Sequence, residues 1–190
     1  MNRKERRAAR KQSSASVTGL FDAALGHHRA GQLAEADRLY RQILSIDPDH
    51  VGTLHSLGLL AHQAGRNDIA ISLLGRVVAL DPGLVPALNN LAKISFLEGH
   101  YAQALAVLRR SLAIKETEQT RLLFVECVAG LRTLPPDNDI HDWFVRALSE
   151  PWSRPSDLAV LAANLVKADG IGASSDVAAI AGHRVLRALL

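Results

Sequence analysis

Apolar residues recur every three or four positions through most of the chain, which is the spacing of a helix that buries one face. Three such stretches each end at a glycine, which can adopt the left-handed backbone conformation that closes a helix. They cover residues 20–30, 54–64 and 88–98. A second amphipathic stretch follows each of them, at residues 34–46, 68–80 and 102–114. The pattern predicts three successive helical hairpins.

The hairpins repeat with a fixed offset of 34 residues. The repeating columns are Leu20, Leu54 and Leu88; Gly31, Gly65 and Gly99; Ala36, Ala70 and Ala104; and Asp47 with Pro48, matched by Asp81 with Pro82. The small alanine lets the two helices of a hairpin approach closely, and the proline ends the unit because it cannot continue the helical ladder. A period of this length predicts stacked repeats that share one continuous core.

The order of residues in each period resembles the tetratricopeptide repeat (TPR) family. The signature positions hold Leu20, Ala23, Ala24, Gly31, Ala36, Tyr40, Ile43 and Pro48, then Leu54, Leu57, Gly58, Gly65, Ala70, Leu74, Val77 and Pro82, then Leu88, Leu91, Ala92, Gly99, Ala104, Leu108 and Ser111. The resemblance implies an all-α fold, a right-handed α-solenoid of three TPR hairpins with about four further helices after them. Glu116 stands where the third proline is expected, so we expect the last repeat helix to run on or its junction to be irregular.

We predict three regions along the chain. Residues 1–16 form a disordered basic tail, residues 17–118 form the repeats (17–50, 51–84 and 85–118), and residues 119–190 form capping or linking helices. Residues 120–131 are too apolar to serve as a polar cap. A helix that places Ile140, Trp143, Phe144, Ala147 and Leu148 on one face is predicted to cover them. Two more helices are predicted from Ser156 and from Ser175 onward.

Residues 147–161 are similar to a linker in large bacterial proteins where TPR repeats precede a class I methyltransferase-type domain that uses S-adenosylmethionine. The last predicted helix leaves Leu186 and Leu190 off its apolar face, and we interpret this as a boundary before a further domain. The chain has no glycine-rich strand-to-helix turn that would hold such a cofactor. The similarity therefore transfers no activity to these residues.

Charge is distributed unevenly along the chain. Residues 1–11 carry six Lys or Arg and one Glu, so the remainder is net negative although the whole chain is +3. Because this basic tail lacks interleaved aromatic residues, we do not expect nucleic-acid binding. The single cysteine, Cys127, excludes an internal disulfide. No apolar stretch approaches the ~20 residues that span a bilayer, and no secretory signal is present, so we predict a cytoplasmic protein without a membrane partner.

The sequence predicts no enzyme, no cofactor and no metal. Among the eight histidines, a zinc site could be built across repeats only from His28, His55 and His62, and their spacing is not that of a local chelate. Carboxylate pairs fall at turns and helix starts, where they satisfy free backbone amides. No serine lies in a nucleophile motif.

The TPR resemblance implies a ligand groove along the first helix of each repeat, on the concave surface. The positions that it implies are Phe21, Asp22, Leu25 and His28, then His55, Ser56, Leu59 and His62, then Asn89, Asn90, Lys93 and Phe96. The predicted peptide-binding site consists of Phe21, His28, His55, His62, Asn89, Asn90, Lys93 and Phe96. The alternative is that at least half of these groups tie adjacent repeats together. Phe21 and Leu25 replace the cation and asparagine of the family's carboxylate clamp, which disfavours chaperone-tail binding, while Asn90 matches an asparagine in the groove of repeat-bearing glycosyltransferases.

Three functions follow as hypotheses. The first is a protein-interaction scaffold that binds a peptide or protein segment in the groove. The second is the non-catalytic substrate-docking region of a larger methyltransferase or glycosyltransferase. The third is self-association through the apolar C-terminal helix.

Overall fold

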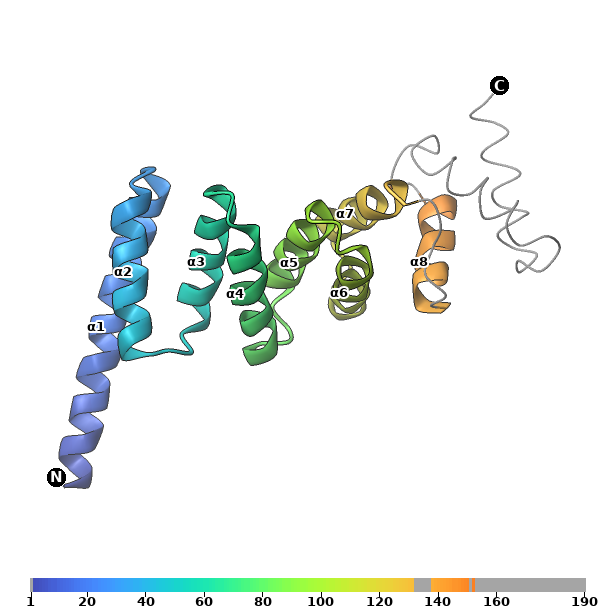
Figure 1. The fold of residues 1–190 in the computed structure, drawn as a ribbon. Coiled ribbons are helices and arrows are strands. Elements are labelled where there is room, and N and C mark those ends of the chain that lie inside the picture. The colour runs from blue at the N-terminus through green and yellow to red at the C-terminus, as the bar shows by residue number, and fades with distance from the viewer. Residues whose placement is uncertain (1, 132–137, 151, 153–190) are drawn as a thin grey trace. The chain divides into compact units, whose positions relative to one another are not determined.

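The computed structural model describes residues 2–131, 138–150 and 152 (Figure 1). Eight α-helices and no strand occur within these residues, as the sequence predicts. The helices are α1 (Arg3–Arg29), α2 (Leu33–Ile46), α3 (Val51–Gln63), α4 (Asn67–Leu80), α5 (Val85–Leu97), α6 (Tyr101–Ile114), α7 (Glu118–Ala129) and α8 (Asn138–Ser149). The helices predicted after residue 152 lie outside the described residues.

Glycine closes the first helix of each hairpin, which confirms the prediction. Gly31, Gly65 and Gly99 have φ angles of 74°, 72° and 79°, in the left-handed region that L side chains rarely adopt. The backbone N–H after each glycine donates to a carbonyl five residues earlier, as Gln32 does to His27. This bond satisfies a free carbonyl at the helix end and reverses the chain into the second helix.

The core repeats with the sequence. Ala36, Ala70 and Ala104 have no exposed surface, and neither do Tyr40, Leu74 and Leu108, which stand four residues later in the same helices. The first and second helices of a hairpin approach closely at the small residues. At Gly58, a Cβ atom would lie 3.1 Å from Cγ of Leu74, so the Leu74 side chain would have to move by a few tenths of an ångström to admit it.

The third repeat ends like the first two despite its missing proline. Helices α2, α4 and α6 each have 14 residues, and α6 ends at Ile114, so it does not run on. The backbone N–H of Lys115 donates to the Ser111 carbonyl, as that of Asp81 does to Val77. Glu116, in place of the proline, instead accepts hydrogen bonds from Arg146.

Helix α1 begins well before the predicted first repeat. Its backbone is helical from Arg3, whereas the sequence predicted a disordered tail up to residue 16. Arg, Lys, Ala and Glu are strong helix formers, and a helix that extends an existing one avoids the cost of nucleation. The division of the chain into tail, repeats and following helices stays a prediction.

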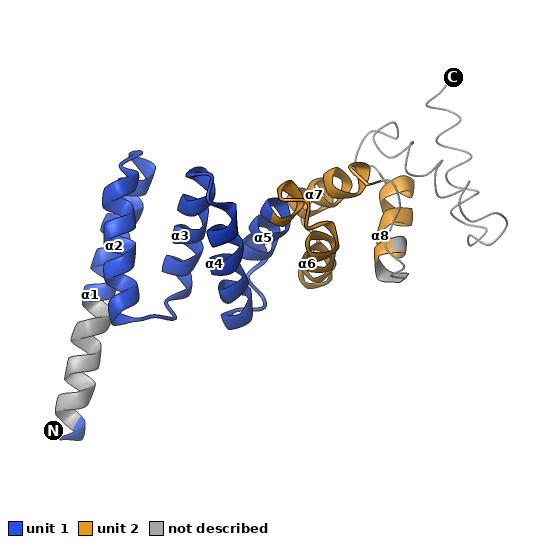
Figure 2. Cartoon of the chain, in the orientation of Figure 1, with its two compact units in different colours: residues 1–94 blue, residues 95–190 orange. Residues whose placement is uncertain are grey.

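The chain divides into two compact units, residues 1–94 and residues 95–190 (Figure 2). The first contains α1 to α4 and most of α5. In the second, α8 packs on α6 and α7, and it buries Ile140, Phe144, Ala147 and Leu148, which confirms the predicted covering helix. Trp152 is also buried and contacts Phe124 of α7 edge to face.

Candidate functional site

Phe21 packs between the first two repeats. Its ring lies 5.2 Å from the ring of His50, just before α3, and 6.3 Å from that of Tyr40 on α2. A Cβ atom at Gly52 would lie only 3.0 Å from Cζ of Phe21. This predicted groove residue therefore fills the junction, and the glycine provides the space for its ring.

His28 links three helices. Its Nδ1 atom lies 3.2 Å from the hydroxyl of Tyr40 on α2, and its Nε2 atom lies 3.1 Å from Oε1 of Gln63 at the end of α3. An amide oxygen can only accept, so Nε2 carries a proton, and in the neutral ring Nδ1 accepts from the tyrosine hydroxyl. The Nδ1 bond thus joins the two helices of the first hairpin, and the Nε2 bond holds that hairpin against the second.

The next junction is made by His55 of α3 and Asn90 of α5. The amide Nδ2 of Asn90 donates to Nε2 of His55 over 3.0 Å, which requires an unprotonated Nε2. Burial lowers the pKa of His55 and so favours the neutral ring that can accept this bond. Asn90, at the family's groove asparagine position, is occupied between repeats.

The remaining residues of the predicted peptide-binding site include His62, Asn89 and Phe96. His62 pairs through Nδ1 with Oδ1 of Asn67, 2.6 Å away, which joins α3 to α4 within one hairpin. Asn89 is buried, with 3% of its surface exposed. Phe96 lies in the second unit, where its ring is 5.3 Å from that of Tyr101 and would clash with a side chain at Gly130, whose Cβ would be 2.6 Å from Cζ of Phe96.

Most of the predicted peptide-binding residues thus connect helices. This favours the alternative that at least half of these groups tie adjacent repeats together. Of the twelve positions on the first helices, Phe21, His28, His55, His62 and Asn90 are half-buried and make the contacts described above. Four others remain in the first unit: Asp22 and Lys93, which are exposed, and Leu25 and Leu59, which are half-buried. We call these four residues the first-helix face. They lie on α1, α3 and α5, which are joined by His28 and by the His55–Asn90 bond.

The described residues offer little reactive chemistry. No group of three or more His, Cys, Asp or Glu there could hold a metal ion, and His28, His55 and His62 each contact other residues. Burial, with a smaller effect of Glu126, raises the pKa of the Cys127 thiol to about 12, so it stays protonated at neutral pH.

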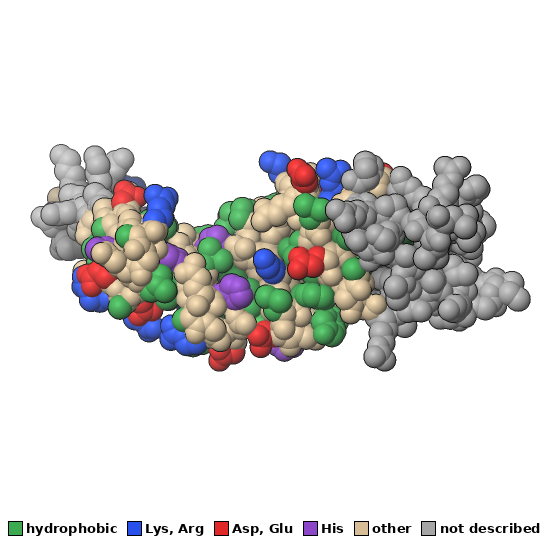
Figure 3. Space-filling model, turned by 90° about the horizontal axis from the view of Figure 1, so that it is seen from above, with side chains coloured by type: hydrophobic (Ala, Val, Ile, Leu, Met, Phe, Trp, Pro, Cys, Tyr) green, Lys and Arg blue, Asp and Glu red, His purple; other side chains and the backbone are tan. Residues whose placement is uncertain are grey.

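Histidines lie among apolar side chains on the face seen in Figure 3. Within the described part, no helix is long and apolar enough to cross a bilayer.

The structure contains a pocket in the first unit that the sequence did not predict. It lies between α2, α3 and α4 in the first unit and has a volume of about 480 Å³. Arg66, which follows the helix-closing Gly65, is one of its cations. The only sequence signal is that the equivalent positions in the other repeats hold the uncharged Gln32 and His100.

The family comparison supports the repeat architecture directly. Residues 61–122 match the model of the tetratricopeptide repeat, and no curated protein sequence matches the chain. This segment covers the end of the second repeat, the third repeat and the start of α7.

Solved structures with the same fold include proteins of different function. The chain is similar to an O-GlcNAc transferase of Thermobaculum terrenum with 26% identity and a TM-score of 0.59, over 72% of this chain but only 26% of the transferase. It is also similar to the Yersinia enterocolitica type III secretion chaperone SycD in complex with a peptide of the translocator YopD, with 14% identity and a TM-score of 0.54, over 70% and 95% of the two chains. A third structure, YrrB, is a TPR protein with an unusual peptide-binding site, with 13% identity, a TM-score of 0.64 and 90% coverage of each chain.

Proposed function

We propose that the chain is a cytoplasmic protein-interaction scaffold that binds a peptide or protein segment across the first-helix face. The observation that supports this proposal is that different residues of α1, α3 and α5 have different roles. His28, His55 and Asn90 hold these helices together, while Asp22 and Lys93 stay exposed and Leu25 and Leu59 are half-buried beside them on the same helices. A surface that is already ordered binds with less loss of conformational freedom.

The chemistry of this face suits a short segment of mixed character. Half-buried Leu25 and Leu59 offer apolar contact, and exposed Asp22 and Lys93 carry opposite charges on α1 and α5. A partner with an aliphatic side chain between a cation and an anion would match these groups in sign. One structural neighbour is a complex with a peptide, and another is described as having a peptide-binding site, which supports binding of this kind on the same fold. Their ligands are not assigned to this chain.

A peptide selection tests the proposal. Random linear peptides displayed on phage are selected against the purified chain, and the binding of the enriched peptides is measured by fluorescence anisotropy. We expect Leu59→Ser combined with Lys93→Ala to weaken binding at least about tenfold, because it removes an apolar contact and a charged hydrogen-bond donor.

Arg76→Ala is the matched control, since it removes an exposed cation from the same unit but outside α1, α3 and α5. Circular dichroism shows whether each variant keeps its helix content. The proposal fails if the double variant binds the selected peptides as tightly as the unmodified chain, or if Arg76→Ala alone abolishes binding.

A second candidate is the substrate-docking region of a larger transferase. Similarity to the O-GlcNAc transferase favours it, because this chain matches only 26% of the length of that protein. The methyltransferase version rests on the sequence similarity of residues 147–161, most of which lie outside the described residues. Extending the chain to its full reading frame and finding a transferase domain would support this candidate, and the first-helix face would then position the substrate. Self-association through the last helix also falls outside the described residues and is tested by the mass in solution at several concentrations.

A further inference from the structure

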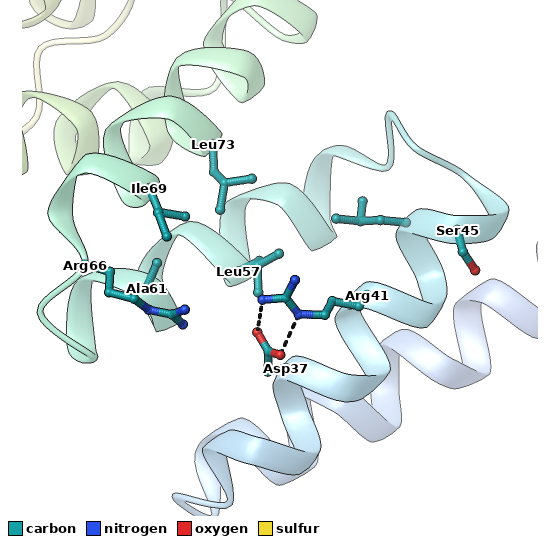
Figure 4. A pocket seen from close by; sticks show the side chains of 9 residues that line it. Asp37, Arg41, Ser45, Leu57, Ala61, Arg66, Ile69 and Leu73 are labelled. Carbon is teal, nitrogen blue, oxygen red and sulfur yellow. Dashed lines mark hydrogen bonds and ion pairs between the residues drawn. The ribbon is translucent and has the colours of Figure 1, made fainter.

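The pocket between α2, α3 and α4 combines an apolar floor with a charged side (Figure 4). Its apolar lining is Leu44, Leu57, Ala61, Ile69 and Leu73. Asp37, Arg41 and Arg66 lie along one side of this floor, with Ile69 and Leu73 on the other. At about 480 Å³, the pocket falls in the ~300–1,000 Å³ range of sites that hold ligands.

The two arginines of the pocket differ in their pairing. Arg41 donates to both carboxylate oxygens of Asp37, over 2.6 and 3.2 Å, so this pair is neutral overall. Arg66 has no ion-pair partner among the described residues, and it lies at the start of α4 without a capping bond from its side chain. The pocket therefore presents one uncompensated cation beside apolar surface.

Stacking of the repeats explains part of the apolar floor but not the charges. One period later, Leu44, Leu57 and Leu73 are matched by the apolar Val78, Leu91 and Val107, whereas Ala61 and Ile69 are matched by the polar Ser95 and Gln103. Stacking therefore accounts for only part of the floor. The charged positions are not kept, since Asp37, Arg41 and Arg66 are matched by Ile71, Gly75 and His100. Packing of adjacent hairpins does not require this arrangement of charges, so it is particular to this pocket.

We infer that this pocket is a second binding site, for an acidic aliphatic peptide segment. The segment places a Leu- or Ile-type side chain on the floor and a carboxylate against Arg66. The sign of Arg66 selects an anion, and its planar guanidinium can hold both oxygens of a carboxylate. The Asp37 carboxylate repels a second anion near Arg41, which limits the site to one acidic group beside the apolar contact. This inference does not depend on binding at the first-helix face.

Two fluorescent peptide pools test the inference on the full chain. One contains Leu, Ile, Ala, Glu and Asp, and the other replaces the acidic residues with Lys. We expect only the acidic pool to bind, and Arg66→Ala to weaken its binding about tenfold through loss of a charge-assisted hydrogen bond. Ile69→Ser is expected to weaken binding as well, because it removes part of the floor.

Each variant has a matched control outside the pocket. Arg76→Ala removes another exposed arginine of α4, and Ile46→Ser removes an aliphatic residue that is 44% exposed, against 40% for Ile69. Both controls should bind the acidic pool normally. Equal loss in a variant and its control would overturn the inference, since it would indicate a general change in the fold.

Other occupants of the pocket give different results. Equal binding of both pools, or loss of binding in the Leu59→Ser, Lys93→Ala variant instead of Arg66→Ala, overturns the inference. Absence of binding to the acidic pool also overturns it. If the mass in solution rises with concentration and Arg66→Ala abolishes that rise while the acidic pool does not bind, the pocket accommodates a second copy of the chain and not a peptide.

Discussion

The junctions of the two units are built from different chemistry. In the first unit, the helices of neighbouring repeats are joined by uncharged hydrogen bonds from His28 to Gln63 and from Asn90 to His55, with an exposed ion pair between Arg76 and Asp49. In the second unit, α8 is held beside α6 and α7 by ions and aromatic rings. There Arg146 pairs with Glu116, between α6 and α7, and Trp152 contacts Phe124 of α7. Arg146 also pairs with Glu150 and lies 4.7 Å from the centre of the Trp143 ring within its own segment.

The contrast reflects what surrounds each junction. Where repeats stack, apolar columns already supply the contact, and short neutral bonds fix the register with little desolvation cost. Where the repeats end, no matching apolar column exists, and a large cluster of aromatic and cationic side chains covers α7. Exposed ion pairs contribute little on their own, so the buried Phe144 and Trp152 carry most of the contact in the second unit.

The largest expected effect tests the apolar part of the second junction. Phe144→Ala removes a side chain with no exposed surface, and we expect the free energy of unfolding to fall by about 3–5 kcal/mol. Both tryptophans of the chain, Trp143 and Trp152, lie in this unit, so urea unfolding followed by tryptophan fluorescence reports on it specifically. Leu122→Ala, at a residue of α7 that is 49% exposed, is the control and should change the transition little. Similar losses in both variants would mean that α8 does not seal this unit.

A smaller effect is expected from the neutral junction. Tyr40→Phe removes only a hydroxyl, but that hydroxyl contacts His28 and hydrogen-bonds with Ser56, which is itself buried. Leaving these partners unsatisfied should lower the free energy of unfolding by about 1–3 kcal/mol. The transition seen by circular dichroism should shift while the tryptophan transition keeps its midpoint. Tyr101→Phe, at a tyrosine that is 46% exposed, should be close to neutral, and an equal effect there would refute the role of the buried hydroxyl.

The smallest expected effect is a difference between the two junctions in how their stability depends on pH. Burial lowers the pKa of His55, so below the ordinary histidine pKa of ~6.5 the unfolded chain binds the proton more readily than the folded one. Stability from this junction is full above that value and falls as the pH decreases through the range between the unfolded and folded pKa values. Hydrogen bonds from Arg146 and Trp152 lower the pKa of Glu150, so the second junction weakens only in the more acidic carboxylate range.

Urea unfolding at about pH 7.5 and about pH 5.5 measures this difference in the two signals. The circular dichroism transition should weaken in mild acid, and the tryptophan transition should not. His55→Gln keeps an oxygen that can accept from Asn90 but cannot titrate there, so it should reduce the dependence. If the pH dependence of the circular dichroism transition is unchanged in this variant, another histidine is responsible for it.

Local patterns predicted most of the fold. The left-handed glycines, the buried alanine column and the covering helix of residues 138–149 all follow from helical periodicity and from the conformations open to glycine and proline. The helical start of α1 was not predicted, because a charged segment reads as a solvated tail unless the helix that it extends is known. The candidate binding residues were predicted as a set, but not which of them would remain accessible.

The sequence by itself determined where the first helix of each hairpin closes and which side chains face the core, because these depend on residues within one or two turns. Tertiary structure alone decided the pairing of residues far apart in the chain, such as Asn90 with His55 and Arg146 with Glu116. It also decided that Arg66 borders an apolar pocket. These contacts depend on how neighbouring helices are placed, and spacing along one helix does not contain that information.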